Sequence, residues 1–471
     1  MIGDQGLSEA VALLPEWLRH QHWFTGARTG TLDVRPVAAT LLHDAEPRVW
    51  HLLAEVTHDD GADVYQVPLS IHAERSDRLD HVHLGRTAEG HVYDALHDKE
   101  ATAALLAHFA DDAPALDGLR FHVRPDVKVP FGDQSLVLPG DHHNTSLAYG
   151  DAALLKVFRR VFPGLNPDVE LHEALSDAGC TLVAPLLGWI DGDWTGDDDG
   201  ASPAGSPTGS LAMLRGYLTT ASDGWALATA SVRDLYAEGD LHADEVGGDF
   251  AAEAYRLGMA TARVHETLAE VLPTGTMSPS DLQGLADAMT GRLERAVSLV
   301  PELEPFAAGL RAHYDVLRTR TEPVPVQRIH GSYHLGQVLR TVLGWKLVDF
   351  EGELMAPVAE RRAMHSPLRD IAQMLRSFDY AALHLVVSDH PPEDPAHEQV
   401  LYRAQEWTER NSEAFCNGYA SAAQLDPRGD LELLAAYETD TAVYEVVFEA
   451  RRRPSWLPIP LAAVERLAQT S

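Results

Sequence analysis

VQRIHGSYHLGQVLRTVLGWKLVDFEGE, residues 326–353, is the most informative segment of this chain. Two apolar pairs lie on either side of Gly344 and are bounded by polar residues, which predicts a loop followed by a short β-hairpin. Such a hairpin brings Gln337, at the start of its first strand, close to Asp349, at the end of its second. Both side chains offer oxygen, and Mg²⁺ is usually held by one or two protein oxygens together with water and phosphate. The segment therefore predicts a magnesium site.

The same segment resembles a known catalytic motif. His330-Gly331, then Gln337, a strand and Asp349-Phe350-Glu351 follow one another as in aminoglycoside-phosphotransferase-like, protein-kinase-like enzymes. In detail the segment is similar to that of actinobacterial maltokinases. The resemblance implies transfer of a phosphoryl group from ATP to a sugar, with Mg²⁺ on Gln337 and Asp349. It also implies catalytic placement of His330, and contacts of His334 and Glu351 with the sugar.

One position of the motif departs from that family. Ser332 stands where the family has an aspartate that accepts the proton of the attacking sugar hydroxyl. A neutral hydroxyl cannot act as this base near pH 7. Because base catalysis contributes about 10²–10⁴-fold, its loss should slow turnover while leaving nucleotide binding in place. The alternative, an ordinary hairpin with a histidine-rich loop, would not require this string of residues.

Length and composition narrow the possible classes of protein. A chain of 471 residues exceeds the usual limit of a single core, so two or three packed units are expected. Its net charge of −34 argues against a general binder of nucleic acid or anionic membranes. Cys180 and Cys416 provide no disulfide framework, and no zinc-like cysteine spacing occurs. Without a basic leader or a membrane-length apolar run, we expect a cytoplasmic protein.

The N-terminal region resembles the cap of the same family. An amphipathic helix is predicted from Ser8 to His20, and the sequence from Trp17 to Arg28 is similar to the opening of the maltokinase cap. Trp17 and Trp23 are interpreted as core anchors rather than sugar contacts. The fold class predicted for the whole chain is α+β, a bilobal protein-kinase-like fold. Its expected parts are an N-terminal cap subdomain (1–100), a β-rich nucleotide-binding subdomain with a hinge (101–218) and a mainly helical C-lobe (219–471).

Two strands within residues 141–160 are predicted to bind the nucleotide, with a turn at Gly150. The first carries small polar residues up to Ser146, whose backbone amides could approach phosphate. No Gly-x-Gly-x-x-Gly is present, so the phosphate-loop signal is weak. By the resemblance, Lys156 on the second strand binds the nucleotide phosphates. An isolated strand lysine is more often simply solvated, and the family match is what favours this role.

A helix and a hinge complete the predicted nucleotide site. Pro167 and Asp168 are typical of a helix start. In this helix Glu170 is the predicted partner of Lys156, and Glu173 is the competing candidate. Met213 and Leu214 begin a hinge, continuing to residue 218, whose backbone would hold adenine.

The C-terminal half is predicted to be mostly helical and to bind the sugar. His265 is interpreted as structural, and Arg369 with Asp370 as a buried ion pair that supports the metal loop. Near the C-terminus an aromatic stripe adjoins a carboxylate stripe at helical spacing, offering ring faces and hydroxyl acceptors. Thr441 stands where the family has lysine. The residues predicted to contact sugar in this helix are Tyr437, Glu438, Tyr444 and Glu445.

On family grounds the predicted reaction is phosphorylation of maltose to maltose 1-phosphate, which feeds α-glucan synthesis. Two alternatives stay open. Ser332 and Thr441 favour a catalytically impaired accessory protein, for example in complex with trehalose synthase. A kinase for another sugar such as glucosamine would instead be favoured by the acidic stripe and by the missing lysine at position 441.

Overall fold

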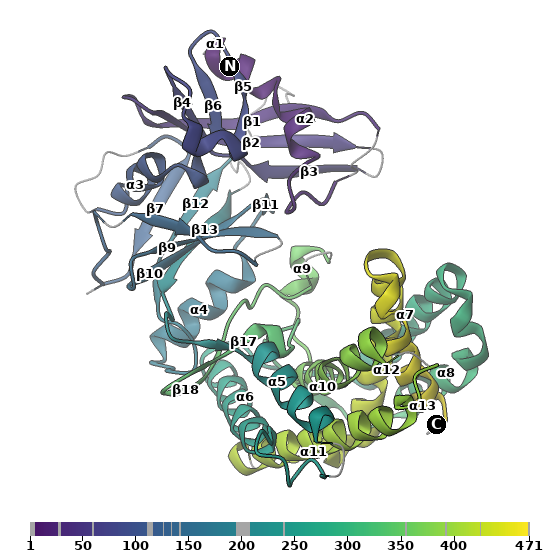
Figure 1. Cartoon of the computed structure of the whole chain (residues 1–471). Coiled ribbons are helices and arrows are strands. Elements are labelled where there is room, and N and C mark those ends of the chain that lie inside the picture. Colours follow the sequence, from purple (N-terminus) through teal and green to yellow (C-terminus); the bar gives the residue numbers. More distant parts are fainter. Residues whose placement is uncertain are drawn as a thin grey trace. The chain divides into compact units, whose positions relative to one another are not determined.

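The computed structural model describes residues 5–26, 30–58, 61–110, 116–125, 127–132, 134–140, 143–194, 208–238, 241–353, 356–390, 393–423 and 425–469. The chain forms two compact units (Figure 1). The first comprises Met1–Glu173 and Ala184–Thr219, and the second comprises Ala174–Val183 and Thr220–Ser471. The boundaries expected at residues 100 and 218 stay predictions.

The first unit opens with a seven-stranded antiparallel sheet. Its order is β11-β3-β2-β4-β6-β5, with β1 also paired to β2. The predicted helix from Ser8 to His20 is instead two short helices, because Pro15 starts a new one. Trp17 and Trp23 are buried with the apolar side of this sheet, in agreement with their predicted core role. The elements are α1 (Gln5–Val11), α2 (Leu14–Leu18), β1 (Asp33–His43), β2 (Arg48–His58), β3 (Gly61–Gln66), β4 (Leu69–His72), β5 (His83–Arg86), β6 (His91–Asp94) and β11 (Arg160–Val161).

A second, six-stranded sheet completes the first unit, in the order β7-β12-β13-β10-β9-β8. The predicted pair of strands around Gly150 is confirmed as β9 and β10, and Gly150 has φ +52°, a conformation that favours glycine. Apolar side chains of this sheet share one core with the helix that follows β6. The elements are α3 (Lys99–Ala107), β7 (Leu119–Val123), β8 (Ser135–Val137), β9 (Asn144–Tyr149), β10 (Ala153–Phe158), α4 (Pro167–Asp177), β12 (Leu186–Asp193) and β13 (Thr208–Gly216).

The second unit is mainly helical, as predicted, and carries the expected hairpin (Figure 1). Strands β17 and β18 pair in antiparallel register, with β14 on the other side of β17. The longest helix, α11, packs along α6. The elements are β14 (Ser222–Asp223), α5 (Gly224–Ala237), α6 (Ala251–Val271), β15 (Gly275–Met277), α7 (Pro279–Leu299), α8 (Ala307–Thr319), β16 (Val324–Val326), η4 (Leu335–Gln337), β17 (Val338–Thr341), β18 (Gly344–Leu347), α9 (Val358–Arg361), α10 (Leu368–Asp389), α11 (His397–Ala423), α12 (Leu431–Arg452) and α13 (Pro458–Gln469).

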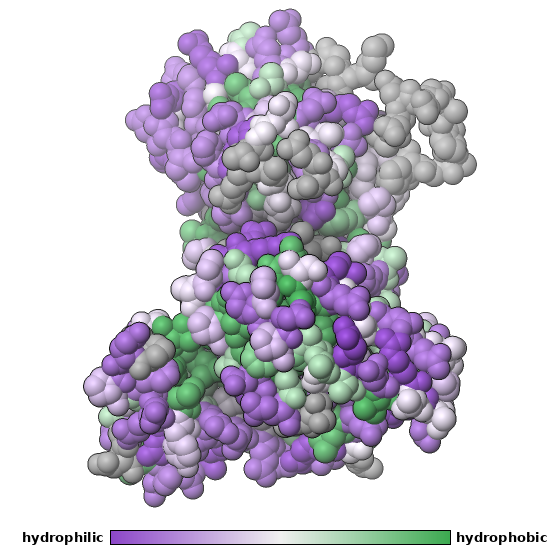
Figure 2. Space-filling model, turned by 90° about the vertical axis from the view of Figure 1, so that its right-hand side faces the viewer, coloured by the Kyte–Doolittle hydropathy of each residue, from purple (hydrophilic) through white to green (hydrophobic). Residues whose placement is uncertain are grey.

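The surface agrees with the charge of the chain. Hydrophilic residues predominate on the face shown in Figure 2. This is expected, since acidic residues number 71 against 37 lysines and arginines.

Candidate functional site

Lys156 lies in a row of side chains that crosses the second sheet of the first unit. On β10 it is directly opposite Ser146 of β9 and Met213 of β13. Directly opposed residues of antiparallel strands place their side chains on the same face of the sheet. Ser146, Lys156 and Met213 therefore share one face, and Leu155 and Leu214 point to the other.

Lys156 is buried and forms an ion pair with Asp168. Its Nζ lies 2.9 Å from Oδ2 of Asp168, and Nδ1 of His172 lies 3.0 Å from the other carboxylate oxygen. Burial alone would raise the pKa of Asp168, but the charges of Lys156 and His172 hold this pKa well below its usual range. Asp168 therefore stays ionised and fixes the lysine on this face of the sheet.

The partner predicted for Lys156 was Glu170, with Glu173 as the competing residue, and this is corrected to Asp168. The helix was identified correctly, but residues two apart on a helix do not face the same way. Asp168 lies in the first turn of α4, where its backbone N–H donates to Oδ1 of Asn166 at 2.9 Å. In the sequence, Asp168 was identified only as a residue typical of a helix start and not as the partner of Lys156. Which side of α4 meets the sheet is decided by packing.

The backbone role predicted for Met213 and Leu214 is also corrected. Strand β13 lies between β10 and β12, so the residues of β13 have ladder partners on both sides. Their backbone groups are used within the sheet and are not available for adenine. The strand ends at Gly216, and the N–H of Tyr217 still donates to Ala152 O at 3.1 Å. Met213 keeps its side chain on the Lys156 face.

In the second unit, the hairpin brings the predicted metal ligands together. The Val348 N–H donates to the Gln337 carbonyl at 3.0 Å, and Asp349 follows directly. His330 donates from Nε2 to the Val348 carbonyl at 2.9 Å. Asp349 has φ +64°, a left-handed conformation that is uncommon outside glycine and concentrates at functional sites.

Gln337 has the chemistry required of a cation ligand. Its Oε1 is buried and, within the described part of the chain, accepts no hydrogen bond. A buried polar atom of this kind calls for an explanation, and a bound cation is one. No cluster of three or more His, Cys, Asp or Glu side chains suited to a metal occurs among the described residues. The amide of Gln337 and the carboxylate of Asp349 fit Mg²⁺, which needs few protein ligands.

The loop that carries Ser332 is held by one face of α10. Asp370 accepts the backbone N–H groups of His330 and Gly331, both at 2.8 Å. Further along the helix, Gln373 Oε1 accepts the Tyr333 N–H at 2.8 Å, and Ser377 Oγ accepts the Leu335 N–H at 2.9 Å.

These three helix residues are spaced by three and four, which places them on one side of α10. The backbone on both sides of Ser332 is thereby fixed.

Asp370 is ionised and fully buried, but the side chain paired with it is not Arg369. Nε2 of His265 lies 3.0 Å from Oδ2 of Asp370, and Nδ1 of His265 lies 3.0 Å from the Tyr419 hydroxyl. Burial would raise the pKa of Asp370, but the hydrogen bond to His265 contributes to holding this pKa below its usual value. Arg369 donates instead to His365 at 2.9 Å. Adjacent helix residues point in different directions, which rules out the predicted pair. The structural role predicted for His265 is the one observed.

Helix α12 connects to the segment that follows Asp349 through Tyr444. Its hydroxyl donates to Oε1 of Glu353 at 2.8 Å, four residues after Asp349. The Tyr444 ring is 41% exposed and stacks with the ring of Phe448 at 6.2 Å. Tyr437 is only 3% exposed, and its contact with sugar stays a prediction. It lies on the side of α12 that packs into the helical core.

A group of carboxylates lies between α10 and α12. Nη2 of Arg376 lies 2.7 Å from Oε2 of Glu445, and Arg376 also contacts Asp379. Burial and the nearby Asp379 charge raise the pKa of both Glu438 and Glu445 to about 7. We call these three acidic residues, Asp379, Glu438 and Glu445, the acidic face. Two cations already contact this face, Arg376 and also Arg466, whose Nη2 lies 2.7 Å from Oδ2 of Asp379.

The other two residues predicted to contact sugar lie in the same segment. Nδ1 of His334 accepts the Gly336 N–H at 3.1 Å at the start of η4. In the neutral ring the proton is therefore on Nε2, which can donate to a ligand. Glu351 is 6% exposed, and its carbonyl accepts from Arg361 Nη1 at 3.1 Å. Because Glu351 is buried, little of its surface is accessible to a sugar.

Comparison with known protein families supports the N-terminal cap that the sequence predicted. Residues 17–98 match the maltokinase N-terminal cap domain. Glucosamine kinase of Streptacidiphilus jiangxiensis is 28% identical over 344 residues, which cover 70% of this chain and 72% of that protein. Glucosamine kinase of Mycolicibacterium smegmatis is 26% identical over 344 residues, covering 69% and 78%.

The whole chain also superposes on a solved structure. A glucosamine kinase in complex with glucosamine, ADP and inorganic phosphate aligns with a TM-score of 0.66 and 24% identity, covering 99% of this chain and 100% of that one. The chain therefore has the kinase-like α+β fold that was predicted, with its N-terminal cap. Among the described helices, none is both long enough and apolar enough to cross a bilayer.

Proposed function

We propose that this protein is a sugar kinase that uses ATP and accepts an amino sugar of the glucosamine type, in preference to maltose. The acidic face is the observation that carries this proposal. It lies on helices that hold the Ser332 loop and that contact the segment after Asp349. Both related proteins reported above are glucosamine kinases.

The charge of the acidic face distinguishes the two sugars. The pKa values of Glu438 and Glu445 are raised to about 7 even though Arg376 lies 2.7 Å from Glu445. An ammonium group would add a further positive charge and would lower both pKa values, whereas a neutral disaccharide offers only hydroxyls. Thr441, which stands where maltokinases have lysine, adds no cation to this helix.

Each unit carries its own set of proposed ligands, for the nucleotide phosphates in the first unit and for Mg²⁺ in the second. Lys156, with Ser146 on the same face, would bind the phosphates, and Gln337 and Asp349 would hold Mg²⁺. The metal, when bound, neutralises charge on the transferred phosphate. Nε2 of His334 would donate to an acceptor in the same region.

Because Ser332 stands where a catalytic base is expected, we expect the unmodified protein to phosphorylate sugar slowly. Because α10 fixes the backbone before and after it, an aspartate introduced there would occupy the place of the missing base. We expect Ser332→Asp to raise the rate of sugar phosphorylation at least tenfold at saturating ATP and Mg²⁺. No increase would mean that the missing-base account is wrong.

The deciding experiment offers the unmodified protein glucosamine and maltose in parallel with ATP and Mg²⁺. Sugar phosphate is followed by ³¹P NMR over hours at high enzyme concentration. We expect product from glucosamine and little from maltose, and Glu445→Gln should weaken glucosamine binding. Glu432→Gln, exposed at the start of the same helix, is the matched control. Equal use of both sugars would contradict the amino-sugar assignment.

A second candidate is a catalytically impaired kinase-like protein, and Ser332 is the observation that favours it. It predicts clear ATP binding without any sugar phosphate. Co-purification with a maltose- or trehalose-metabolising enzyme, such as trehalose synthase, would then identify its role. Product formation by the unmodified protein excludes this candidate.

A further inference from the structure

A buried charge joins the two sheets of the first unit. Arg159 directly follows β10 and is completely buried. Its Nη2 lies 2.5 Å from Oδ2 of Asp94, at the end of β6 in the first sheet. Its Nε donates to the Thr145 hydroxyl of β9 at 2.8 Å, and its guanidinium lies 4.6 Å from the centre of the Trp23 ring. A guanidinium with this many fixed partners cannot shift without losing one of them.

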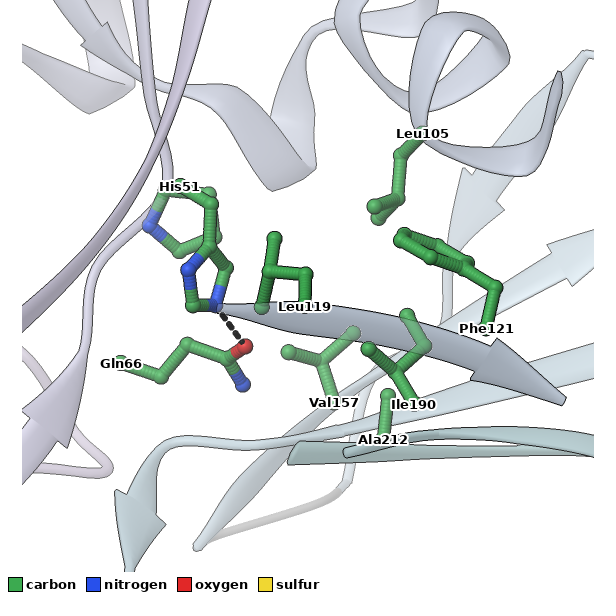
Figure 3. A pocket seen from close by; sticks show the side chains of 9 residues that line it. His51, Gln66, Leu105, Leu119, Phe121, Val157, Ile190 and Ala212 are labelled. Carbon is green, nitrogen blue, oxygen red and sulfur yellow. Dashed lines mark hydrogen bonds between the residues drawn. The ribbon is translucent and has the colours of Figure 1, made fainter. Parts of the chain in front are cut away.

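A second buried group, Gln66 at the end of β3, makes the same connection. Its Nε2 donates to the carbonyls of Phe158 and Leu211, both at 2.9 Å. Its Oε1 accepts from Nε2 of His51 at 2.6 Å, the contact drawn in Figure 3. The remaining walls of the small cavity in Figure 3 are mostly apolar, among them Leu119, Val157 and Ile190. The hydrogen bond from His51 thus fixes which way the Gln66 amide points.

These contacts fall on the three strands that carry the Lys156 row. Thr145 precedes Ser146 on β9, Phe158 lies two residues after Lys156 on β10, and Leu211 lies two residues before Met213 on β13. Apolar packing alone would tolerate small sliding of one sheet over the other. Buried directional bonds do not, because each displaced group would be left without a partner.

We propose that Arg159 is a positioning residue through which the first sheet sets the place of Lys156 against a nucleotide. Asp94 and Gln66, on the first sheet, are its counterparts. This inference rests on the proposed function only in taking Lys156 to bind nucleotide phosphate. It assigns to the cap a part in nucleotide binding, although the cap itself contributes none of the nucleotide-binding residues.

The test replaces the ion pair by apolar residues of similar size, Asp94→Leu with Arg159→Met. Such replacement of a buried pair usually preserves stability, whereas removing one partner does not. We expect a thermal midpoint close to that of the unmodified protein and at least a tenfold loss of affinity for a fluorescent ATP analogue with Mg²⁺. Glu55→Leu with Arg35→Met, another ion pair of the first sheet, is the control and should leave the affinity unchanged.

Two further measurements keep the result decisive. Arg159→Lys retains the charge but not the planar fork, and we expect it to fold and to show a smaller loss of affinity. Amide hydrogen exchange without nucleotide should be faster in β9, β10 and β13 of the double variant and unchanged in the control.

A folded double variant with unaltered affinity and unaltered exchange would overturn the positioning role. If the unmodified protein binds no nucleotide, the proposed function fails, and hydrogen exchange alone decides the inference.

Discussion

The Lys156 row and the Ser332 loop reach their positions by different means. In the row, strand register places Ser146, Lys156 and Met213 on one face, and each strand is held by many ladder bonds. In the loop, a few side chains of α10 hold successive backbone N–H groups. The row should therefore tolerate the loss of one contact better than the loop does.

The largest effect is expected at Asp370, the main anchor of the loop. In Asp370→Asn an NH₂ group replaces one oxygen that now faces a backbone N–H or His265. Because a buried, charged hydrogen-bond network is broken, we expect the free energy of unfolding to fall by about 4 kcal/mol. Urea unfolding measures it. Asp389→Asn, at the exposed end of the same helix, should have no effect, and a loss at Asp370 below about 1 kcal/mol would contradict the anchoring role.

The substitution Lys156→Met removes a buried charge from the Lys156 row, as Asp370→Asn removes one from the anchor of the Ser332 loop. Asp168 would stay buried but keep His172 as its partner. We therefore expect a smaller loss of unfolding free energy, about 3 kcal/mol. Adding Asp168→Leu should restore most of the stability without restoring nucleotide affinity. If nucleotide affinity returns in the double variant, Lys156 does not bind phosphate.

A pH titration tests the buried hydrogen bond between His51 and Gln66, which connects the first sheet to the strands of the Lys156 row. Burial lowers the pKa of His51 to about 4, against 6.5 for an exposed ring. The unfolded chain therefore binds this proton more readily, and stability is lost as pH falls from 6.5 towards 4. Between pH 7.5 and pH 5 the loss from His51 should be about 2 kcal/mol.

The control for this titration is His51→Asn, which keeps a donor for Gln66. Unfolding in urea at several pH values should show a flatter dependence in the variant. Parallel curves for the two proteins would mean that His51 is not held neutral.

The smallest effect is expected at Ser377, the last of the three α10 residues that hold the Ser332 loop. Ser377→Ala removes one acceptor, that of the Leu335 N–H, and should cost about 1 kcal/mol of unfolding free energy. Ser388→Ala on the same helix, where the hydroxyl is exposed, serves for comparison. A loss at Ser377 as large as that at Asp370 would show that the loop is anchored cooperatively rather than bond by bond.

Sequence by itself determined the local elements and the motif. The β17–β18 hairpin, the strand pair around Gly150, the start of α4 and the helical C-terminal half all depend on short-range turn chemistry and hydrophobic periodicity. These signals lie within a few residues of one another, so they can be read before the chain is folded. The order of motif residues around His330 and Asp349 indicated the kinase-like fold only through its resemblance to a known family of kinases.

Only the tertiary structure decided which side chains meet. It selected Asp168 over Glu170, gave Asp370 to His265 instead of Arg369, and placed Tyr437 in the core while leaving Tyr444 exposed. It also made β13 a central strand, so the backbone groups of Met213 and Leu214 are bonded within the sheet and cannot bind adenine. In each case the residue type and the element were visible in sequence. The direction in which a side chain points depends on the neighbour against which its element packs, and that neighbour is distant in the chain.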